Sequence, residues 1–481
     1  MNTNKNLMLI FLMVLITTFL FGQEYKIKVK IKNLPDKDTL LLAHRFTDKL
    51  YADDTTLVDK NGSGTFSKKK KLDGGIYVVI IPALRKQYFE FLIDQSQQFS
   101  IETDTSDFIA NIKVSGSDEN KKFFDWQRSM AKLEKKMKEI QQKIKNYSDK
   151  KMQDSVKVWQ ENGITIDNER KAYWDKIKKD DPSSLLAKIL NVLTPVEIPK
   201  PDYPENMPKR DSLVRLFQYV YNKDHYWDNI DFSDDRLLRT PFIESKLKEF
   251  FKNIVLTQPD SLTKESIKVC ELARKNKYFF QYIVIYTTNY FETSQIMGMD
   301  RVFVNLADKY YLSDQCWWAD STIISKIGER VTKIKPNMLG EIAPDLKMED
   351  VNGQWQQLKF MKADFIILIF WEPNCGHCKK EVPKLYELYK TLRDKGVEVF
   401  AVYTQNDTTE WKKFINEHGL DWINVYDKYH FTNFRNLYDI YSTPVIYILD
   451  KNKIIIAKRI GVEQIEKFLE FERNKKMNSS Y

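Results

Sequence analysis

Two cysteines separated by two residues stand in the stretch Cys375-Gly-His-Cys378. An apolar run precedes them and an amphipathic run follows, so we expect the pair to open a helix directly after a buried strand. This spacing on a first helical turn brings the sulfurs close enough to bond, and unsatisfied amides with the helix dipole lower the pKa of the first thiol. His377 can favour the thiolate further through a positive charge or a hydrogen bond. Because a thiolate is the attacking species in disulfide exchange, the motif predicts thiol–disulfide chemistry.

The same cysteine spacing also occurs in zinc sites and in haem attachment sequences. Zinc would need two more ligands, and the C-terminal region offers only His418 and His430 at no spacing typical of a zinc site. Covalent haem attachment places a histidine directly after the second cysteine, where this chain has Lys379. We therefore expect no metal and no cofactor at the motif.

The elements around the motif alternate between strand and helix from about residue 338. The run DFIILIFW before the motif is continuously apolar, as in a buried central strand. The run KKEVPKLYELYKTLRDKG after it is amphipathic and ends in Gly396. A second apolar strand, a further helix, a strand pair and a closing helix follow before residue 475. This order predicts an α/β architecture for residues 338–475.

Two regions of different character precede this layer. Residues 24–115 contain short alternating runs at roughly ten-residue spacing with turn signals between them, which predicts an antiparallel β-sandwich or barrel. Residues 118–335 carry helical spacing and predict a mainly helical region. Its apolar stripe from Phe123 to Tyr147 has heptad spacing, which favours a long helix packed on the following helix, with a dimeric coiled coil as the alternative. Five of the 15 prolines fall in residues 195–208, an expected connector or lid.

Composition narrows the class of protein. The 42% hydrophobic and 30% charged residues exclude a disordered chain, and four cysteines in 481 residues are too few for a disulfide scaffold. Cys270 and Cys316 fall in helical patterns, where buried thiols are favoured and a structural disulfide is the alternative. The net charge of +9 is small beside 76 basic and 67 acidic residues, so it indicates no acidic partner.

The first 22 residues predict an export signal. The apolar run from Leu7 to Phe21 is shorter than the ~20 residues of a bilayer span and has the length of a signal-peptide core. Gly22 is a small residue at a plausible cleavage point, and an uncleaved membrane anchor is the alternative. Either way the sequence predicts a periplasmic or cell-envelope location, which makes nucleic acid a poor expectation as partner.

The stretch FWEPNCGHCKKEVP resembles the active site of thioredoxin-fold proteins, most closely the exported TlpA/ResA-type thiol–disulfide oxidoreductases. The resemblance covers about residues 338–475. Trp371 matches the family tryptophan beside the redox pair, and Pro383 matches the proline that kinks the active-site helix. Tyr441-Ser-Thr-Pro444 matches the loop whose proline is cis. The resemblance implies a thioredoxin fold here.

The resemblance also implies roles for individual residues. Trp371, His377, Thr443 and Pro444 would form the substrate-binding surface, with the Thr443 backbone pairing with a substrate strand. Thioredoxins carry a buried aspartate just before the tryptophan, where this chain has Ile369.

The TlpA/ResA-type proteins instead have a glutamate three residues after the second cysteine, where Glu381 stands. Glu381 would then help to deprotonate Cys378 as a general base. A surface helix glutamate is the alternative interpretation, and Glu372 is a second candidate base.

The resemblance implies an exported thiol–disulfide oxidoreductase, with disulfide reduction favoured. Cys375 would attack a substrate disulfide and Cys378 would resolve the mixed disulfide. The partners would be exported proteins with disulfides or thiols and a membrane electron donor. Because Cys-Gly-His-Cys also occurs in disulfide isomerases, the direction stays open.

Two alternative functions remain. One is a thiol peroxidase of the AhpC/TSA type, although Pro373 lies only two residues before Cys375 and the Pro-x-x-x-Thr-x-x-Cys arrangement is missing. The other is an envelope ligand-binding protein with a secondary redox module. The regions before residue 338 resemble domains that precede thioredoxin modules in exported Bacteroidetes proteins, which implies organisation and assigns no functional residue.

Overall fold

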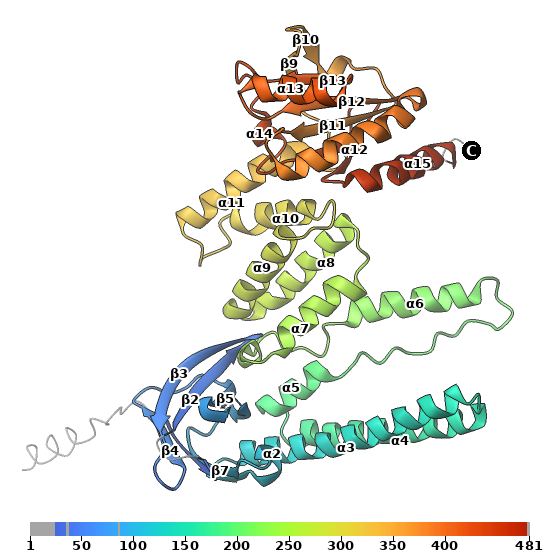
Figure 1. Ribbon diagram of the computed structural model, residues 1–481. Helices are drawn as coiled ribbons and strands as arrows, with labels where there is room; N and C mark the ends of the chain where they lie inside the picture. The colour runs from blue at the N-terminus through green and yellow to red at the C-terminus, as the bar shows by residue number, and fades with distance from the viewer. Residues whose placement is uncertain (1–24, 35–37, 85–86, 479–481) are drawn as a thin grey trace, which may run out of the picture. The chain divides into compact units, whose positions relative to one another are not determined.

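The computed structural model describes residues 25–34, 38–84 and 87–478 (Figure 1). The predicted signal peptide, residues 1–22, lies outside the described residues. The chain forms two compact units. One unit runs to Val255 and includes Arg274–Phe279, and the other comprises Leu256–Ala273 and Phe280–Tyr481. The division at Val255 falls inside the range 118–335 that the sequence pattern treats as one helical region.

The first unit begins with two four-stranded sheets whose apolar faces pack together. At this contact Phe91 of one sheet meets Phe99 of the other edge to face, with 5.7 Å between the ring centroids. The first sheet has the order β4 (Ser63–Lys68), β1 (Tyr25–Lys32), β7 (Gln98–Asp104) and β8 (Lys113–Ser115). The second has the order β3 (Lys49–Leu57), β2 (Thr39–Phe46), β5 (Gly75–Ile81) and β6 (Gln87–Ile93).

This arrangement confirms the predicted N-terminal sandwich with one difference in strand direction. β1 pairs with β7 in parallel, whereas the prediction made every pair antiparallel. The parallel pair arises because the chain leaves the second sheet after β6 and enters the first sheet as β7, beside a strand that is not its neighbour in sequence.

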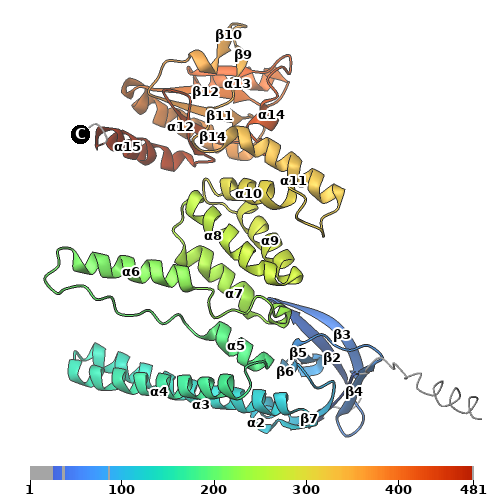
Figure 2. The same cartoon turned by 180° about the vertical axis from the view of Figure 1, so that it is seen from behind.

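Helices complete the first unit. The heptad stripe lies on α3 (Asp118–Asp149), which packs along α4 (Gln153–Asp180) as an antiparallel hairpin (Figures 1 and 2). Trp174 of α4 donates its ring N–H to the Met130 sulfur of α3 at 3.3 Å. The favoured interpretation of the stripe, a long helix on its successor, therefore matches the structure. The shorter helices are α2 (Phe108–Asn111), α5 (Leu185–Leu193), α6 (Arg210–His225) and α7 (Phe242–Glu249).

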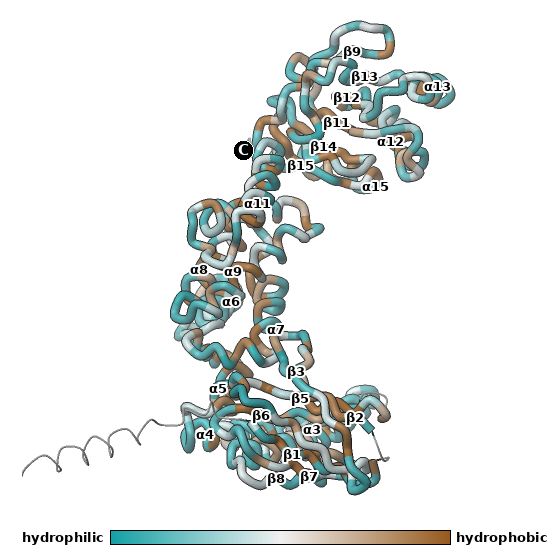
Figure 3. The backbone as a smooth tube through the Cα atoms, turned by 90° about the vertical axis from the view of Figure 1, so that its left-hand side faces the viewer, coloured by the Kyte–Doolittle hydropathy of each residue, from teal (hydrophilic) through white to brown (hydrophobic). Residues whose placement is uncertain are grey.

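The second unit joins a helical segment to an α/β layer. The helices of that segment are α8 (Pro259–Leu272), α9 (Lys277–Glu292, whose first three residues belong to the first unit), α10 (Asp300–Leu306) and α11 (Ser321–Ile334). Hydropathy colouring shows hydrophilic and hydrophobic residues intermixed along the elements, as expected of amphipathic structure (Figure 3). Among the described residues, no helix combines the length and the apolar character needed to cross a bilayer.

The α/β layer is a seven-stranded sheet in the order β10-β9-β13-β12-β11-β14-β15. Its strands are β9 (Lys347–Asp350), β10 (Trp355–Gln357), β11 (Phe365–Trp371), β12 (Val397–Tyr403), β13 (Ile423–Tyr426), β14 (Val445–Asp450) and β15 (Ile455–Lys458). Its helices are α12 (Gly376–Leu392), α13 (Thr408–His418), α14 (Phe434–Leu437) and α15 (Val462–Asn478). β11 runs parallel to β12 and antiparallel to β14.

β11 is buried on both faces, which explains its unbroken apolar sequence. Alternate side chains, such as Ile369 and Trp371, pack with α12, α13 and α15. The intervening ones, such as Leu368 and Phe370, pack with α14 and the residues before β9. α12 begins shortly after the carboxyl end of this central strand. The predicted C-terminal α/β region is confirmed.

Candidate active site

Cys375 stands at the junction of β11 and α12. It is the N-cap residue of α12, with extended backbone angles of φ −81° and ψ 125°, and its side chain is partly exposed. In the thiol form its sulfur donates to the carbonyl oxygen of Thr443 at 3.2 Å. Because the first amides of a helix have no partner inside the helix, those that follow Cys375 can serve its sulfur.

The surroundings of Cys375 favour its thiolate. Partial burial alone raises the pKa of the Cys375 thiol, but hydrogen bonds from the backbone amides of Cys378 and His377 oppose it, and the pKa lies below its ordinary value. A lowered pKa increases the fraction of thiolate near neutral pH. Cys375 is thus both the accessible thiol of the pair and the more readily ionised one.

Cys378 has the opposite surroundings. Its side chain is fully buried beneath the start of α12, against the face of the sheet that also holds Ile369 and Trp371. Burial, with a smaller contribution from the charge of Cys375, raises the pKa of the Cys378 thiol to about 12. Cys378 is therefore a neutral thiol at neutral pH.

The loop before β14 faces the pair. The Thr443–Pro444 peptide bond is cis, as the resemblance implied. The Thr443 hydroxyl donates to Glu372 Oε1 at 3.0 Å, and Gln405 donates to the other oxygen of the same carboxylate. Glu372 thus ties this loop to the ends of β11 and β12, and Gln405 is a contributor that the sequence pattern did not reveal.

Trp371 lies beneath the Cys375–Cys378 motif, whereas His377 lies on the surface beside it. Trp371 is fully buried and packs against Phe414, with 5.2 Å between the ring centroids. It supports the motif from beneath and offers no surface to a substrate in this structure. His377 is exposed on the first turn of α12, beside Thr443 and Pro444 in a common groove.

Glu381 lies on the same face of α12 as His377 and lines the same groove. Its carboxylate is half-buried and accepts from Lys384 Nζ at 2.8 Å. Among the described residues, no hydrogen bond joins Glu381 to Cys378. Its role as general base stays a prediction.

An ionic cluster beside the loop was not foreseen. Asp439 is only 2% exposed and accepts from Arg459 Nη2 at 2.7 Å and from Arg330 of α11. Its backbone is left-handed, with φ 52°, a conformation in which aspartate is more frequent than most residues. Arg330 precedes Asp439 by 109 residues, so no local pattern could have linked the two.

The other two cysteines lie away from the motif. Cys270 and Cys316 are buried, as the favoured interpretation expected, and Cys270 Sγ lies 3.6 Å from the Thr287 hydroxyl. Within the described parts of the chain, no group of three or more histidine, cysteine, aspartate or glutamate residues is arranged to hold a metal ion.

Comparisons with known proteins divide the chain into three parts. Residues 339–458 match the AhpC/TSA family, residues 171–342 match a domain of unknown function (DUF5106), and residues 25–123 match a second such domain (DUF4369). The α/β layer and its redox turn, residues 371–378 between β11 and α12, therefore fall largely within the AhpC/TSA match. The regions before this layer match domains of unknown function.

Individual relatives match between 27% and 29% of this chain. Thiol-disulfide oxidoreductase ResA of Bacillus thuringiensis (strain Al Hakam) is 31% identical over 134 residues, which are 27% of this chain and 76% of the relative. ResA of Geobacillus kaustophilus is 31% identical over 27% of this chain and 76% of its own length. A solved domain of a possible thiol-disulfide isomerase from Cytophaga hutchinsonii is 45% identical over 29% of this chain and 97% of that chain, with a TM-score of 0.28.

The geometry of the redox turn and of the loop opposite it indicates the same family as the matched relatives. The Cys375–Cys378 pair opens a helix after the central strand, and the cis-proline loop faces Cys375. The AhpC/TSA match, residues 339–458, contains that arrangement, and two ResA proteins are 31% identical to this chain over 76% of their own length. This chain therefore belongs to the ResA-type family of thioredoxin-fold thiol–disulfide oxidoreductases.

Proposed function

We propose that this protein is an exported disulfide reductase in which Cys375 attacks the substrate and Cys378 resolves the mixed disulfide. The opposite surroundings of the two thiols carry the proposal. Cys375 is partly exposed with a lowered pKa, whereas Cys378 is fully buried with a pKa raised to about 12. Only the first thiol can meet a substrate disulfide as a thiolate near neutral pH.

The first step forms a mixed disulfide. The Cys375 thiolate attacks one sulfur of the substrate disulfide, that S–S bond breaks, and the departing substrate sulfur takes up a proton. The new bond also removes the negative charge of Cys375. Because that charge contributes to the raised pKa of Cys378, its loss makes Cys378 easier to deprotonate.

The second step transfers the electrons. Cys378 loses its proton and attacks Cys375 Sγ, which forms the Cys375–Cys378 disulfide and releases the second substrate sulfur as a thiol. Two electrons have then passed from the protein to the substrate. A dithiol electron donor at the membrane returns the pair to the reduced state by the same exchange in reverse.

The loop before β14 supplies the docking edge for the substrate. Thr443 holds Cys375 through its carbonyl oxygen, and Glu372 holds the Thr443 hydroxyl. A substrate strand that pairs with the Thr443 backbone brings its disulfide next to Cys375. His377 lines the exposed side of the same site.

Single-cysteine variants test the mechanism. Pre-reduced Cys378→Ser should accumulate a mixed disulfide with insulin through Cys375, whereas Cys375→Ser should neither trap nor reduce insulin. Mass spectrometry of the trapped species identifies the attacking sulfur. Equal trapping by the two variants would contradict the assignment of roles.

The reduction potential of the Cys375–Cys378 pair tests whether the protein reduces or oxidises its substrates. A disulfide reductase should equilibrate with glutathione at a potential near that of thioredoxin, about −270 mV. A value near about −120 mV is typical of a strong oxidant and would overturn the reductase proposal. That result would not contradict thiol–disulfide oxidoreductase activity itself.

Glu381 is proposed as the group that helps to deprotonate Cys378. The variant Glu381→Gln keeps the size of the side chain and removes its basic group. It should shift the pH dependence of mixed-disulfide resolution, measured as release of the second insulin sulfur. An unchanged pH profile would reject the role.

Export is proposed from residues 1–22. N-terminal sequencing of the protein recovered from cell envelopes should begin at Gln23 if the segment is cleaved. A start at Met1 in the membrane fraction would indicate the uncleaved anchor. Recovery from the cytoplasm would contradict export.

The matched AhpC/TSA family keeps a thiol peroxidase as the second candidate function. That activity would convert Cys375 to a sulfenic acid with hydrogen peroxide, and Cys378 would then condense with it. The reduced protein should consume peroxide far more slowly than it reduces insulin. Faster peroxide consumption would favour the peroxidase.

A further inference from the structure

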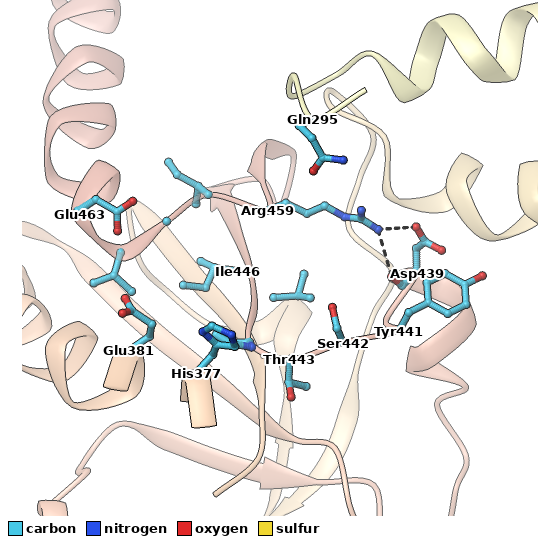
Figure 4. A pocket seen from close by; sticks show the side chains of 15 residues that line it. Gln295, His377, Glu381, Asp439, Tyr441, Ser442, Thr443, Ile446, Arg459 and Glu463 are labelled. Carbon is cyan, nitrogen blue, oxygen red and sulfur yellow. Dashed lines mark hydrogen bonds and ion pairs between the residues drawn. The ribbon is translucent and has the colours of Figure 1, made fainter. Parts of the chain in front are cut away.

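A groove of about 530 Å³ opens beside the redox turn. One side of it is formed by His377 of α12 together with Thr443 of the loop before β14 (Figure 4). Pro444 of the same loop also lines the groove. Ile446 of β14 and Arg459, directly after β15, continue it along the sheet edge. Its volume falls in the range of sites that enclose small ligands or a few residues of a peptide.

One wall of the groove comes from the helical segment that precedes the AhpC/TSA match. Gln295, in the loop between α9 and α10, lines the groove and extends toward Arg459 in Figure 4. Its side chain is exposed, and within the described part of the chain its amide nitrogen donates only to the neighbouring Thr293 carbonyl at 3.2 Å. The amide oxygen is accessible to a ligand, and the amide nitrogen needs to break only this local bond.

Two partly buried ionic clusters hold this wall against the α/β layer. Asp300, at the start of α10, accepts from Lys458 Nζ at 2.5 Å, and Lys458 also donates to Asn337 at 2.7 Å. Arg330 of α11 binds the buried Asp439 beside the loop. Separating such pairs would leave uncompensated charges in the protein interior, so the wall has a defined place beside the groove.

The groove is continuous with the site of disulfide exchange. Thr443 lines it and also accepts the hydrogen bond of the Cys375 thiol. A protein substrate whose disulfide reaches Cys375 can therefore lay the adjoining stretch of its chain along this surface. A small-molecule disulfide has no such stretch, so it can reach Cys375 without entering the groove.

We propose that the loop between α9 and α10 is a substrate-specificity element, in which Gln295 binds the extended polypeptide that flanks the disulfide of a protein substrate. The element selects protein disulfides over small-molecule disulfides. The inference rests on the proposed function, because it concerns substrate binding for that same exchange. It assigns a task to the helical segment that precedes the thioredoxin-like layer.

The test compares two substrates with the mature, full-length protein. kcat/KM is measured for insulin and for bis(2-hydroxyethyl) disulfide, and the ratio of the two constants reports selectivity. Gln295→Trp fills the groove and should lower the ratio about tenfold, while Gln295→Ala removes one polar contact and should lower it about threefold. The reduction potential should stay the same in both variants, because neither change touches the cysteines.

A matched control places the same bulky residue elsewhere on the sheet. Gln354 is exposed in the turn between β9 and β10, at the opposite edge of the sheet from β14 and β15. Gln354→Trp should leave the ratio unchanged. Equal ratios for Gln295→Trp and Gln354→Trp would overturn the inference while the oxidoreductase activity stands. A wild-type protein that reduces neither disulfide would overturn the proposed function and the inference together.

Discussion

The two pairs of cysteines occupy regions of the second unit that treat a thiol in opposite ways. Cys375 and Cys378 belong to the redox turn, which we define as residues 371–378 between β11 and α12. Cys270 and Cys316 belong to the helical segment, residues 256–273 and 280–334. Cys375 is the partly exposed member of the four, whereas the other three are buried.

The difference lies in the backbone amides available to each sulfur. Cys375 caps α12, where the first amides have no helical partner and can hydrogen-bond a thiolate. Cys270 lies inside α8, where the surrounding amides are already bonded along the helix. The reactivity of a thiol therefore follows from its place on a helix, so a cysteine count alone says little about function.

Thiol labelling should show the largest contrast between the two regions. Under native reducing conditions, we expect iodoacetamide to modify Cys375 and to leave Cys270, Cys316 and Cys378 unmodified. The thiolate fraction of Cys378 should be at least ~1,000-fold lower than that of Cys375, because its pKa is about 12 and that of Cys375 is below its ordinary value near 9. Peptide mass spectrometry after a short pulse measures each site. Modification of Cys270 at the rate of Cys375 would contradict the comparison.

The buried thiol of the redox turn should make the stability of the reduced protein depend on pH. The unfolded Cys378 ionises near pH 9, whereas the native one keeps its proton up to about pH 12. Between these values the unfolded state binds fewer protons, so the free energy of unfolding falls as pH rises, by about 4 kcal/mol in total. Urea unfolding of the reduced wild type and of Cys378→Ala isolates this dependence, because Cys375 is common to both. A difference between the two proteins that stays constant above pH 9 would reject it.

Much of the redox turn could be predicted from the sequence because its chemistry is local. The cysteines, the apolar strand before them and the helix after them are contiguous, so residue type and period were sufficient to place Cys375 at a helix start. The cis-proline loop was placed by resemblance, and its contact with Cys375 needed the fold.

Contacts between distant segments could not be predicted. Arg330 and Asp439 are 109 residues apart, and Gln295 reaches the groove from a loop with no chemical motif. The parallel pairing of β1 with β7 is similar, because alternation predicts strands and a buried face but not which strand lies beside which. Trp371 shows the same limit, since the resemblance placed it at the substrate surface and packing buries it.

The ionic link between the helical segment and the loop beside the redox turn should have a measurable coupling energy. Arg330→Gln should destabilise the protein by about 2 kcal/mol, because it removes one of two cations from the buried Asp439. The same change in an Asp439→Gly background should cost little, since glycine accepts the left-handed backbone and carries no charge. A double-mutant cycle by urea unfolding measures the difference. Additive effects would mean that Arg330 acts independently of Asp439.

The smallest effect should come from the thiol of the helical segment. Cys270→Ala removes a buried sulfur beside Thr287, but the Thr287 hydroxyl already donates to the Ile283 carbonyl at 2.7 Å. No polar group of Thr287 is then left unsatisfied, and the small cavity should cost about 1 kcal/mol in the free energy of unfolding. The rate of insulin reduction should equal that of the wild type, because Cys270 lies outside the redox turn. A loss of reduction in a variant that remains folded would show that the helical segment takes part in the exchange, and the division between the two regions would then fail.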